Sequence, residues 1–245
     1  MSREEFKIET QLVQGSGEFT EGQPRVYPIY QTTTYDYNSP EVLAELFDLK
    51  RDGYMYSRIG NPTVTAFEEK IAQLEKGVGA LALASGQAAN VTAILNICGC
   101  GDHIVSLATI YGGTANLFKS TLKKYGITAT FVSPEASEEE IKTAFQENTK
   151  VLFGETLGNP EMNVIDFEKL VRVGKEKGVP VIVDNTLASP YLCNPIEYGV
   201  NIVTHSATKY IDGQGAALGG VIVDGGNFNW DNGKFPDLVE PDSAY

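Results

Sequence analysis

The chain has 245 residues, of which 42% are hydrophobic, a size and composition that suit one large globular domain and exclude disordered and collagen-like classes. Its formal net charge of −13 disfavours a nucleic-acid or anionic-membrane partner, because a polyanion would be repelled. The first ten residues lack the apolar core of a secretory signal, and no run reaches the ~20 apolar residues of a membrane helix.

Residues 1–78 are predicted to form an N-terminal arm with helices. An extended stretch rich in Thr and Tyr covers 27–35, one helix is expected near 40–51, and a second is expected to end at Lys76. Few apolar positions of this arm could be buried against one another. We therefore expect it to pack on another subunit.

From Gly79 onward, short apolar runs alternate with helical patterns, which is typical of a parallel sheet covered by helices. The predicted strands are 80–84, 103–108, 128–133, 150–155, 179–184, 201–204 and 218–223. The predicted helices are 86–97, 113–125, 137–148 and 166–177. Residues 79–245 are thus expected to form a three-layer α/β domain with a mostly parallel sheet. Periodicity is lost from Asn227 to the C-terminus.

The three cysteines, Cys98, Cys100 and Cys193, fit neither a disulfide framework nor the spacing of a zinc site. We expect no metal centre and a reducing, cytoplasmic setting.

Ser85-Gly86-Gln87 stands between a predicted strand and the start of a predicted helix. Free backbone N–H groups at a helix N-terminus, closely approachable at a glycine, suit the binding of a phosphate. When such a motif stands alone, an ordinary helix cap is the commoner interpretation.

Asp184 ends the predicted strand 179–184, at the edge where α/β sheets bind ligands. An unpaired carboxylate is costly there, and a cationic ring nitrogen would be a fitting partner. The alternative is a capping or turn residue.

Lys209 follows the predicted strand 201–204, close to the hydroxyls of Ser206 and Thr208. Among apolar neighbours a lysine can lose its charge and act as a nucleophile or base, and the hydroxyls could bind phosphate. An ordinary surface lysine is the alternative. Taken in order, the three segments supply a phosphate cradle, an acid for a ring nitrogen and an amine, which are the partners that pyridoxal phosphate needs.

Longer motifs resemble the Cys/Met-metabolism family of pyridoxal-phosphate enzymes. They are Tyr56-Ser-Arg58-Ile-Gly-Asn-Pro62, Ser85-Gly-Gln-Ala-Ala89, Gly101-Asp-His103, Tyr111-Gly-Gly-Thr114, Glu155-Thr-Leu-Gly-Asn-Pro160, Asp184-Asn-Thr-Leu-Ala-Ser-Pro-Tyr191 and His205-Ser-Ala-Thr-Lys209-Tyr-Ile-Asp-Gly213. The resemblance runs from about Pro28 to the end of the chain. It implies the large domain of a fold-type-I, aspartate-aminotransferase-like transferase.

The resemblance also implies roles for individual residues. Lys209 would hold the cofactor covalently, Asp184 would pair with the pyridine nitrogen, and Tyr111 would stack on the ring. The phosphate would be held by Gly86, Gln87, Ser206 and Thr208, helped by Tyr56 and Arg58 from a neighbouring subunit. Asn159 would lie near the phenolic oxygen of the cofactor. The family thus implies a homo-oligomer with shared active sites, expected as a dimer of dimers, with a dimer as the alternative.

Within the family, 85–89 and 111–118 most resemble the O-acetylhomoserine sulfhydrylases, whereas methionine γ-lyases typically carry cysteine in place of Gly113. This implies γ-replacement on O-acetylhomoserine with sulfide or a small thiol, giving homocysteine or methionine. Methionine or cystathionine γ-lyase and cystathionine γ-synthase are the alternatives. Gln214 stands where the family usually has histidine, and the family's smaller C-terminal domain, with the arginine for the substrate carboxylate, does not follow in this chain.

Three other classes can be weighed against this interpretation. Ser206-Ala-Thr-Lys209 matches the S-x-x-K motif of serine β-lactamases, but Ser-Asp-Asn and Lys-Thr-Gly are absent. A Rossmann dehydrogenase is disfavoured because no G-x-G-x-x-G follows the first predicted strand. A non-catalytic cofactor-binding fragment stays open, because the chain lacks the second domain.

Overall fold

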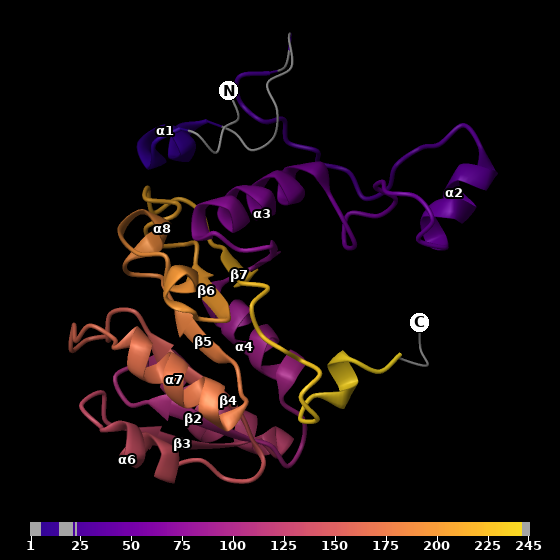
Figure 1. Ribbon diagram of the computed structural model, residues 1–245. Helices are drawn as coiled ribbons and strands as arrows, with labels where there is room; N and C mark the ends of the chain where they lie inside the picture. The colour runs from indigo at the N-terminus through magenta and orange to yellow at the C-terminus, as the bar shows by residue number, and fades with distance from the viewer. Residues whose placement is uncertain (1–5, 15–21, 23, 242–245) are drawn as a thin grey trace. The chain divides into compact units, whose positions relative to one another are not determined.

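The computed structural model describes residues 6–14, 22 and 24–241, and its internal contacts divide the chain into two units, 1–70 and 71–245 (Figure 1). Helix α3 (Pro62–Glu75) is continuous in sequence across this division, and its last residues, 71–75, belong to the second unit.

The first unit has little regular structure besides α1 (Ile8–Val13), α2 (Pro40–Phe47) and the start of α3. An isolated bridge pairs Thr34 with Tyr56, and the Tyr37 hydroxyl donates to the Tyr54 carbonyl at 2.8 Å. The helix expected near 40–51 is present but ends at Phe47. Large apolar side chains of this unit are exposed, as the sequence predicts for an arm that cannot bury itself; they include Val26, Ile29, Phe47, Leu49 and Ile59.

The second unit contains a seven-stranded sheet in the order β1-β7-β6-β5-β4-β2-β3, which confirms all seven predicted strands within a few residues at each end. The strands are β1 (Gly79–Leu83), β2 (His103–Leu107), β3 (Thr128–Val132), β4 (Thr149–Glu155), β5 (Val181–Asp184), β6 (Ile202–Ser206) and β7 (Gly220–Asp224). Strand β5 begins at Val181, later than predicted, because Pro180 has no backbone N–H to donate.

The sheet is mostly parallel, as expected, but β7 runs antiparallel to both β1 and β6. The connection from β6 to β7, residues 207–219, contains no helix. A parallel return needs a crossover connection, which is usually helical, so the chain comes back antiparallel instead. The antiparallel pairing of β7 with its two neighbours therefore follows from the short connection that precedes it.

Helices cover both faces of the sheet, giving the predicted three layers (Figure 1). Ile182 of β5 belongs to the core cluster formed with α4 (Gly86–Ile97), whereas its neighbour Val181 lies under Gly174 of α7 (Phe167–Lys177). Adjacent strand residues face opposite sides of a sheet, so α4 and α7 lie on opposite faces. Both helices begin at side-chain caps: Ser85 accepts from the Ala88 N–H, and Asp166 accepts from the Lys169 N–H.

Two of the predicted helices differ from the helices that the structure contains. Residues 113–125 divide into α5 (Gly112–Asn116), a π-helical turn (Leu117–Thr121) and a 3₁₀ turn (Leu122–Tyr125). The wider turn keeps Leu117, Phe118 and Leu122 buried. The helix expected at 137–148 is only α6 (Glu138–Thr143), because the Gln146 N–H turns to the Thr149 hydroxyl.

Among the described residues of this unit, the remaining short elements are α8 (Ser189–Leu192) and the 3₁₀ turns Pro195–Tyr198 and Pro236–Leu238. The C-terminal stretch, aperiodic in sequence, is anchored by an edge-to-face cluster of Phe228, Trp230 and Phe235, which packs on the core. Residues 242–245 lie outside the described part.

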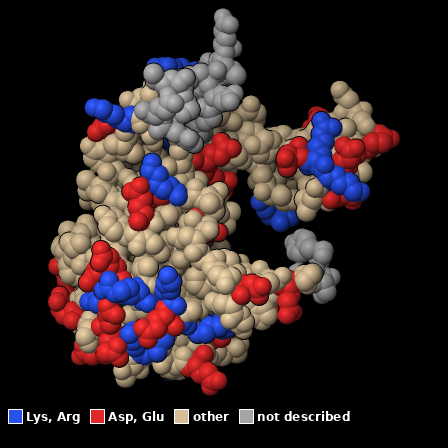
Figure 2. Space-filling model, in the orientation of Figure 1, with Lys and Arg blue, Asp and Glu red and all other residues tan. Residues whose placement is uncertain are grey.

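Charged side chains of both signs occur on α6 and α7, and basic and acidic groups are intermixed on the face drawn in Figure 2. Lys142 pairs with Glu176 at 2.6 Å and Arg172 with Glu138 at 2.7 Å, so these basic groups are neutralised locally. Such an arrangement does not form the continuous basic surface that nucleic-acid binding requires. Among the described helices, none combines the length and apolar character needed to cross a bilayer.

His103 joins three strands at the amino-terminal end of the sheet. Its Nδ1 lies 2.8 Å from the Thr149 hydroxyl of β4 and its Nε2 lies 2.9 Å from the Thr130 hydroxyl of β3. Burial lowers the pKa of His103 below its ordinary value.

We predict that His103 makes the protein less stable as the pH falls from about 7 to about 5, because the unfolded chain then binds a proton that the folded chain resists. In urea titrations, the difference in unfolding free energy between the native protein and His103→Gln should shrink over this range. A difference that stays constant would show that His103 titrates alike in both states.

Candidate active site

A cavity of about 780 Å³ opens at the carboxyl ends of β4, β5 and β6 in the second unit. This is the edge at which α/β sheets bind ligands. Among its lining residues are Ser85, Gly86, Gln87, Asn90, Tyr111, Thr114, Glu155, Asn159, Asp184, Thr186, Ser206, Thr208 and Lys209. The structure therefore brings together every site residue predicted from the sequence except Tyr56 and Arg58.

One wall of the cavity is the N-terminus of α4. The Ala88 and Ala89 N–H groups bond back to Ser85, whereas the Gly86 and Gln87 N–H groups have no partner among the described residues. A Cβ added at Gly86 would lie 2.5 Å from the Ser206 Cβ, so only glycine lets α4 approach the end of β6 this closely. Two free donors and the helix dipole thus face the cavity beside a serine.

The floor of the cavity is the carboxylate of Asp184, which three donors fix in place. Its Oδ1 accepts from the Thr186 N–H at 3.0 Å and from the Thr186 hydroxyl at 2.5 Å. Its Oδ2 accepts from the Asn90 amide at 3.2 Å, and the Asn90 carbonyl in turn accepts from the Thr204 hydroxyl at 2.6 Å. The Thr186 hydroxyl also accepts from the Ser206 N–H at 2.7 Å, which ties the end of β5 to that of β6.

Tyr111 stands at the start of α5 with its ring half exposed at the cavity. Its backbone N–H donates to Glu155 Oε1 at 2.7 Å. A Cβ at Gly113 would lie 2.4 Å from the Tyr111 ring, so any larger residue there would push the ring away. The absence of a side chain at Gly113 therefore helps to set the position of Tyr111.

Lys209 lines the cavity, and the residue is exposed. The reason is local, since residues after Lys209 form turns at the surface rather than a covering element. The Ser206 hydroxyl has no hydrogen-bond partner within the described residues, whereas the Thr208 hydroxyl donates to the Gly219 carbonyl at 3.2 Å and accepts from the Gly219 N–H at 3.1 Å. Thr208 therefore has to exchange a partner before its hydroxyl can donate to a ligand.

The remaining predicted residues are placed differently. Asn159 lines the cavity, and its backbone N–H donates to the Thr109 carbonyl at 3.2 Å. Tyr56 and Arg58 belong to the first unit, where the Arg58 guanidinium carbon lies 5.3 Å from the centre of the Tyr56 ring. That cation–π contact keeps the two side chains together.

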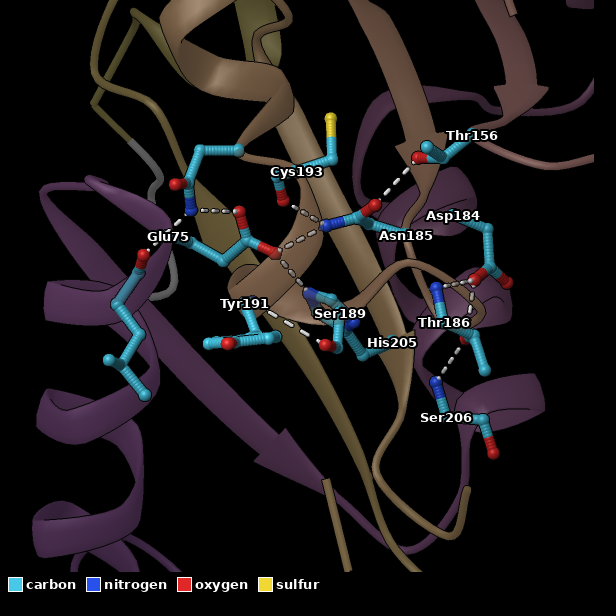
Figure 3. Close-up of polar contacts among 12 residues, drawn as sticks. Glu75, Thr156, Asp184, Asn185, Thr186, Ser189, Tyr191, Cys193, His205 and Ser206 are labelled. Carbon is cyan, nitrogen blue, oxygen red and sulfur yellow. Dashed lines mark hydrogen bonds and ion pairs between the residues drawn. The ribbon is translucent and has the colours of Figure 1, made fainter. Parts of the chain in front are cut away.

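A fully buried polar network lies behind the cavity (Figure 3). Glu75 Oε1 is 2.6 Å from His205 Nε2 and accepts from the Asn185 amide at 2.8 Å. The Asn185 amide also donates to the Cys193 carbonyl, and its oxygen accepts from the Thr156 hydroxyl at 2.7 Å. Because Asn185 and His205 directly adjoin Asp184 and Ser206 in sequence, the network fixes the ends of the two strands that build the cavity.

Sequence reasoning missed three contributors to this site. Asn90 lies one turn after Gln87 on α4, and Thr186 follows Asp184 by two residues, a spacing typical of an Asx turn that could have indicated it. Glu155, at the end of β4, begins one of the motifs that resemble the family, but the sequence indicated no role for it. Burial, and then the nearby Asp184 carboxylate, raise the pKa of Glu155 to about 8.

The residues of the cavity fit pyridoxal phosphate. The free Gly86 and Gln87 N–H groups and the Ser206 hydroxyl suit its phosphate, the fixed Asp184 carboxylate suits a protonated ring nitrogen, and the Lys209 amine suits its aldehyde. The model of the Cys/Met metabolism PLP-dependent enzyme family matches residues 9–238. The chain belongs to this family.

Relatives in the Cys/Met-metabolism family agree with that assignment. The chain is 44% identical over 241 residues to O-acetyl-L-homoserine sulfhydrylase of Leptospira meyeri, covering 98% of this chain and 54% of the relative. It is 49% identical over 224 residues to homocysteine/cysteine synthase of Saccharomyces cerevisiae, covering 90% of this chain and 50% of the relative. The chain thus spans about half the length of the curated relatives it matches.

Solved structures of similar pyridoxal-phosphate enzymes confirm that the chain has the fold of a fold-type-I large domain. A Campylobacter jejuni protein described as an O-acetylhomoserine (thiol)-lyase, solved with N'-pyridoxyl-lysine-5'-monophosphate, superposes with a TM-score of 0.84 at 33% identity, over 100% of this chain and 58% of that one. Cystathionine γ-lyase of Lactobacillus plantarum, complexed with L-serine, gives a TM-score of 0.80 at 35% identity, over 89% of this chain and 55% of that one.

Proposed function

We propose that the parent protein catalyses γ-replacement on O-acetylhomoserine, in which sulfide or a small thiol displaces acetate to give homocysteine or methionine. The observation that carries this proposal is the convergence of the Lys209 amine, the Asp184 carboxylate and the free N-terminus of α4 on one cavity, in a chain 44–49% identical to enzymes named for that chemistry.

The residues divide the work as follows. Bound pyridoxal phosphate supplies an electron sink for negative charge at the substrate Cα. The Gly86 and Gln87 N–H groups and the Ser206 hydroxyl would hold its phosphate, with Thr208 as a further donor, and the Asn159 side chain would serve its phenolic oxygen. Lys209 would hold it covalently, and its amine would be the base that moves the Cα proton. The Tyr111 phenol, which lines the same cavity, would assist proton transfer at the amine or at the departing acetate.

The choice of γ-replacement over γ-elimination is supported by Gly113. The Tyr111 ring occupies the space that a side chain at 113 would fill, so the cysteine that methionine γ-lyases typically carry there would require a different ring position. The full-length protein should release acetate and form homocysteine from O-acetylhomoserine and sulfide. Release of methanethiol and 2-oxobutyrate from methionine alone, with no homocysteine in the first assay, would make it a γ-lyase.

Asp184 is proposed to keep the ring nitrogen protonated, because a fixed carboxylate favours the charged form of its partner. Asp184→Asn should retain bound cofactor but lower turnover by roughly 10²-fold or more, since the electrostatic stabilisation of charge that develops in the reaction is lost. The exposed Asp237→Asn is the matched control. Near-normal turnover of Asp184→Asn, with cofactor bound, would remove Asp184 from this role.

We further propose a homo-oligomer, as a dimer of dimers, in which Tyr56 and Arg58 reach the phosphate in a neighbouring subunit. Support comes from the exposed apolar side chains of the first unit, which need a partner surface, and from the planar Arg58 fork, which suits phosphate. Its place would be the cytoplasm, where the unpaired Cys98, Cys100 and Cys193 remain reduced.

Sharing of sites can be tested by complementation. Hybrid oligomers of full-length Arg58→Ala and Lys209→Ala subunits should regain activity that neither variant has alone, because some sites then combine an intact Arg58 with an intact Lys209. Hybrids that form, as judged by differently tagged subunits, yet stay inactive would place Arg58 in the site of its own subunit.

A further inference from the structure

Two carboxyl groups face the cavity from adjacent strands. Glu155 ends β4 and Asp184 ends β5, and the parallel register pairs these two residues directly. Both line the cavity on the face of the sheet that carries α4. Like charges placed directly across two strands repel, so the pair is costly if both groups are ionised.

The surroundings of the two groups decide which one keeps its charge. The Asp184 carboxylate accepts from three donors, two on Thr186 and one on Asn90. Among the described residues, the Glu155 side chain accepts a hydrogen bond only from the Tyr111 N–H, and just 6% of the Glu155 surface is exposed. No lysine or arginine in the described part of the chain forms an ion pair with either group. The negative charge is therefore better stabilised on Asp184.

We propose that Glu155 is a positioning residue that remains a neutral acid while the enzyme works, leaving Asp184 as the single carboxylate charge for the ring nitrogen and holding Tyr111 through its backbone. This inference rests on the proposed binding of pyridoxal phosphate in the cavity. Its physical basis is the directly opposed pair and the unequal number of donors. The raised pKa of Glu155, about 8, agrees with it.

A neutral Glu155 has a consequence for catalysis. One carboxylate balances one protonated ring nitrogen, whereas a second negative charge in the same cavity would oppose the spread of negative charge from the substrate into the ring. Ionisation of Glu155 at alkaline pH should therefore lower kcat without loss of the cofactor. The hydrogen bond from the Tyr111 N–H to Glu155 should persist on ionisation, because the N–H can donate to an oxygen of either form of the carboxyl.

The protonation state can be read directly by infrared spectroscopy. In the full-length protein, a protonated-carboxyl C=O band should be present at pH 6, disappear as the pH rises through about 8, and be missing from Glu155→Gln. The matched control is Glu135→Gln, which alters an exposed carboxyl outside the cavity and should leave the band in place. This measurement works with or without bound cofactor.

Activity provides the second readout. Glu155→Gln, which mimics the neutral acid and still accepts from the Tyr111 N–H, should keep kcat within about threefold at pH 7 and lose the alkaline fall of kcat near pH 8. Glu155→Ala leaves that N–H unpartnered and should weaken cofactor binding roughly tenfold.

Two results would overturn the inference. One is a native protein without the carboxyl band at pH 6, or with a band that persists in Glu155→Gln. The other is a Glu155→Gln enzyme that folds and binds cofactor but loses activity more than about a hundredfold at pH 7, which would require the charge of Glu155. If the native protein binds no pyridoxal phosphate, the proposed function fails, and the infrared band still decides the state of Glu155.

Discussion

Replacing Lys209 by alanine should abolish covalent attachment of pyridoxal phosphate to the full-length protein. Lys209 provides the amine that lines the cavity beside the Ser206 hydroxyl and the N-terminus of α4. After borohydride reduction, the native protein should carry a pyridoxyl group on the peptide that contains Lys209, and the variant should carry none. Turnover should fall by roughly 10²–10⁴-fold from loss of the proton-transfer group alone.

Two controls separate this role from a general effect of removing a lysine. Lys175→Ala alters an exposed lysine on α7, outside the cavity, and should label and react like the native protein. Lys209→Arg keeps the positive charge but has no amine to attack the aldehyde, so it should remain unlabelled. A pyridoxyl group recovered on another lysine of the native protein would assign the attachment elsewhere.

The sheet was predictable because its strands are continuous apolar runs. Val181, Ile182 and Val183 are all fully buried, as a strand covered on both faces requires. Residues at or just after the ends of such strands reach the ligand-binding edge, which made Asp184 and Lys209 candidates by position, and the family resemblance then implied their roles. The antiparallel direction of β7 was harder to predict from sequence, since it depends on the lack of a helix in the connection from β6 to β7.

The partners of the site residues could not be predicted from local sequence. Asn90 contacts Asp184 from a helix 94 residues earlier, and Glu155 lies opposite Asp184 only once the strand order is known. The exposure of Lys209 likewise depends on what covers it, which neighbouring residue types do not specify. A pattern along the chain indicates which edge carries the chemistry, whereas hydrogen bonds and burial there follow from tertiary packing.

Glu75 is the clearest case of such long-range dependence, and its removal should cost the protein much of its stability. Glu75 and His205 are 130 residues apart in sequence, and both side chains are fully buried. Glu75 also accepts from the amides of Asn185 and Asn194. Without its carboxylate, the fully buried side chains of Asn185 and His205 each lose one hydrogen-bond partner, and His205 Nδ1 already has none in the described residues.

Glu75→Ala should therefore lower the unfolding free energy by about 2–5 kcal/mol, because each buried donor that loses its acceptor costs about 1–3 kcal/mol. Urea denaturation measures this, with the exposed Glu147→Ala as the control that should change little. Glu75→Gln keeps an acceptor oxygen of the same reach and should lose less. Equal stability of Glu75→Ala and the control would mean that the ends of β5 and β6 are held without the network, by the bond from the Ser206 N–H to Thr186 and by the core beneath it.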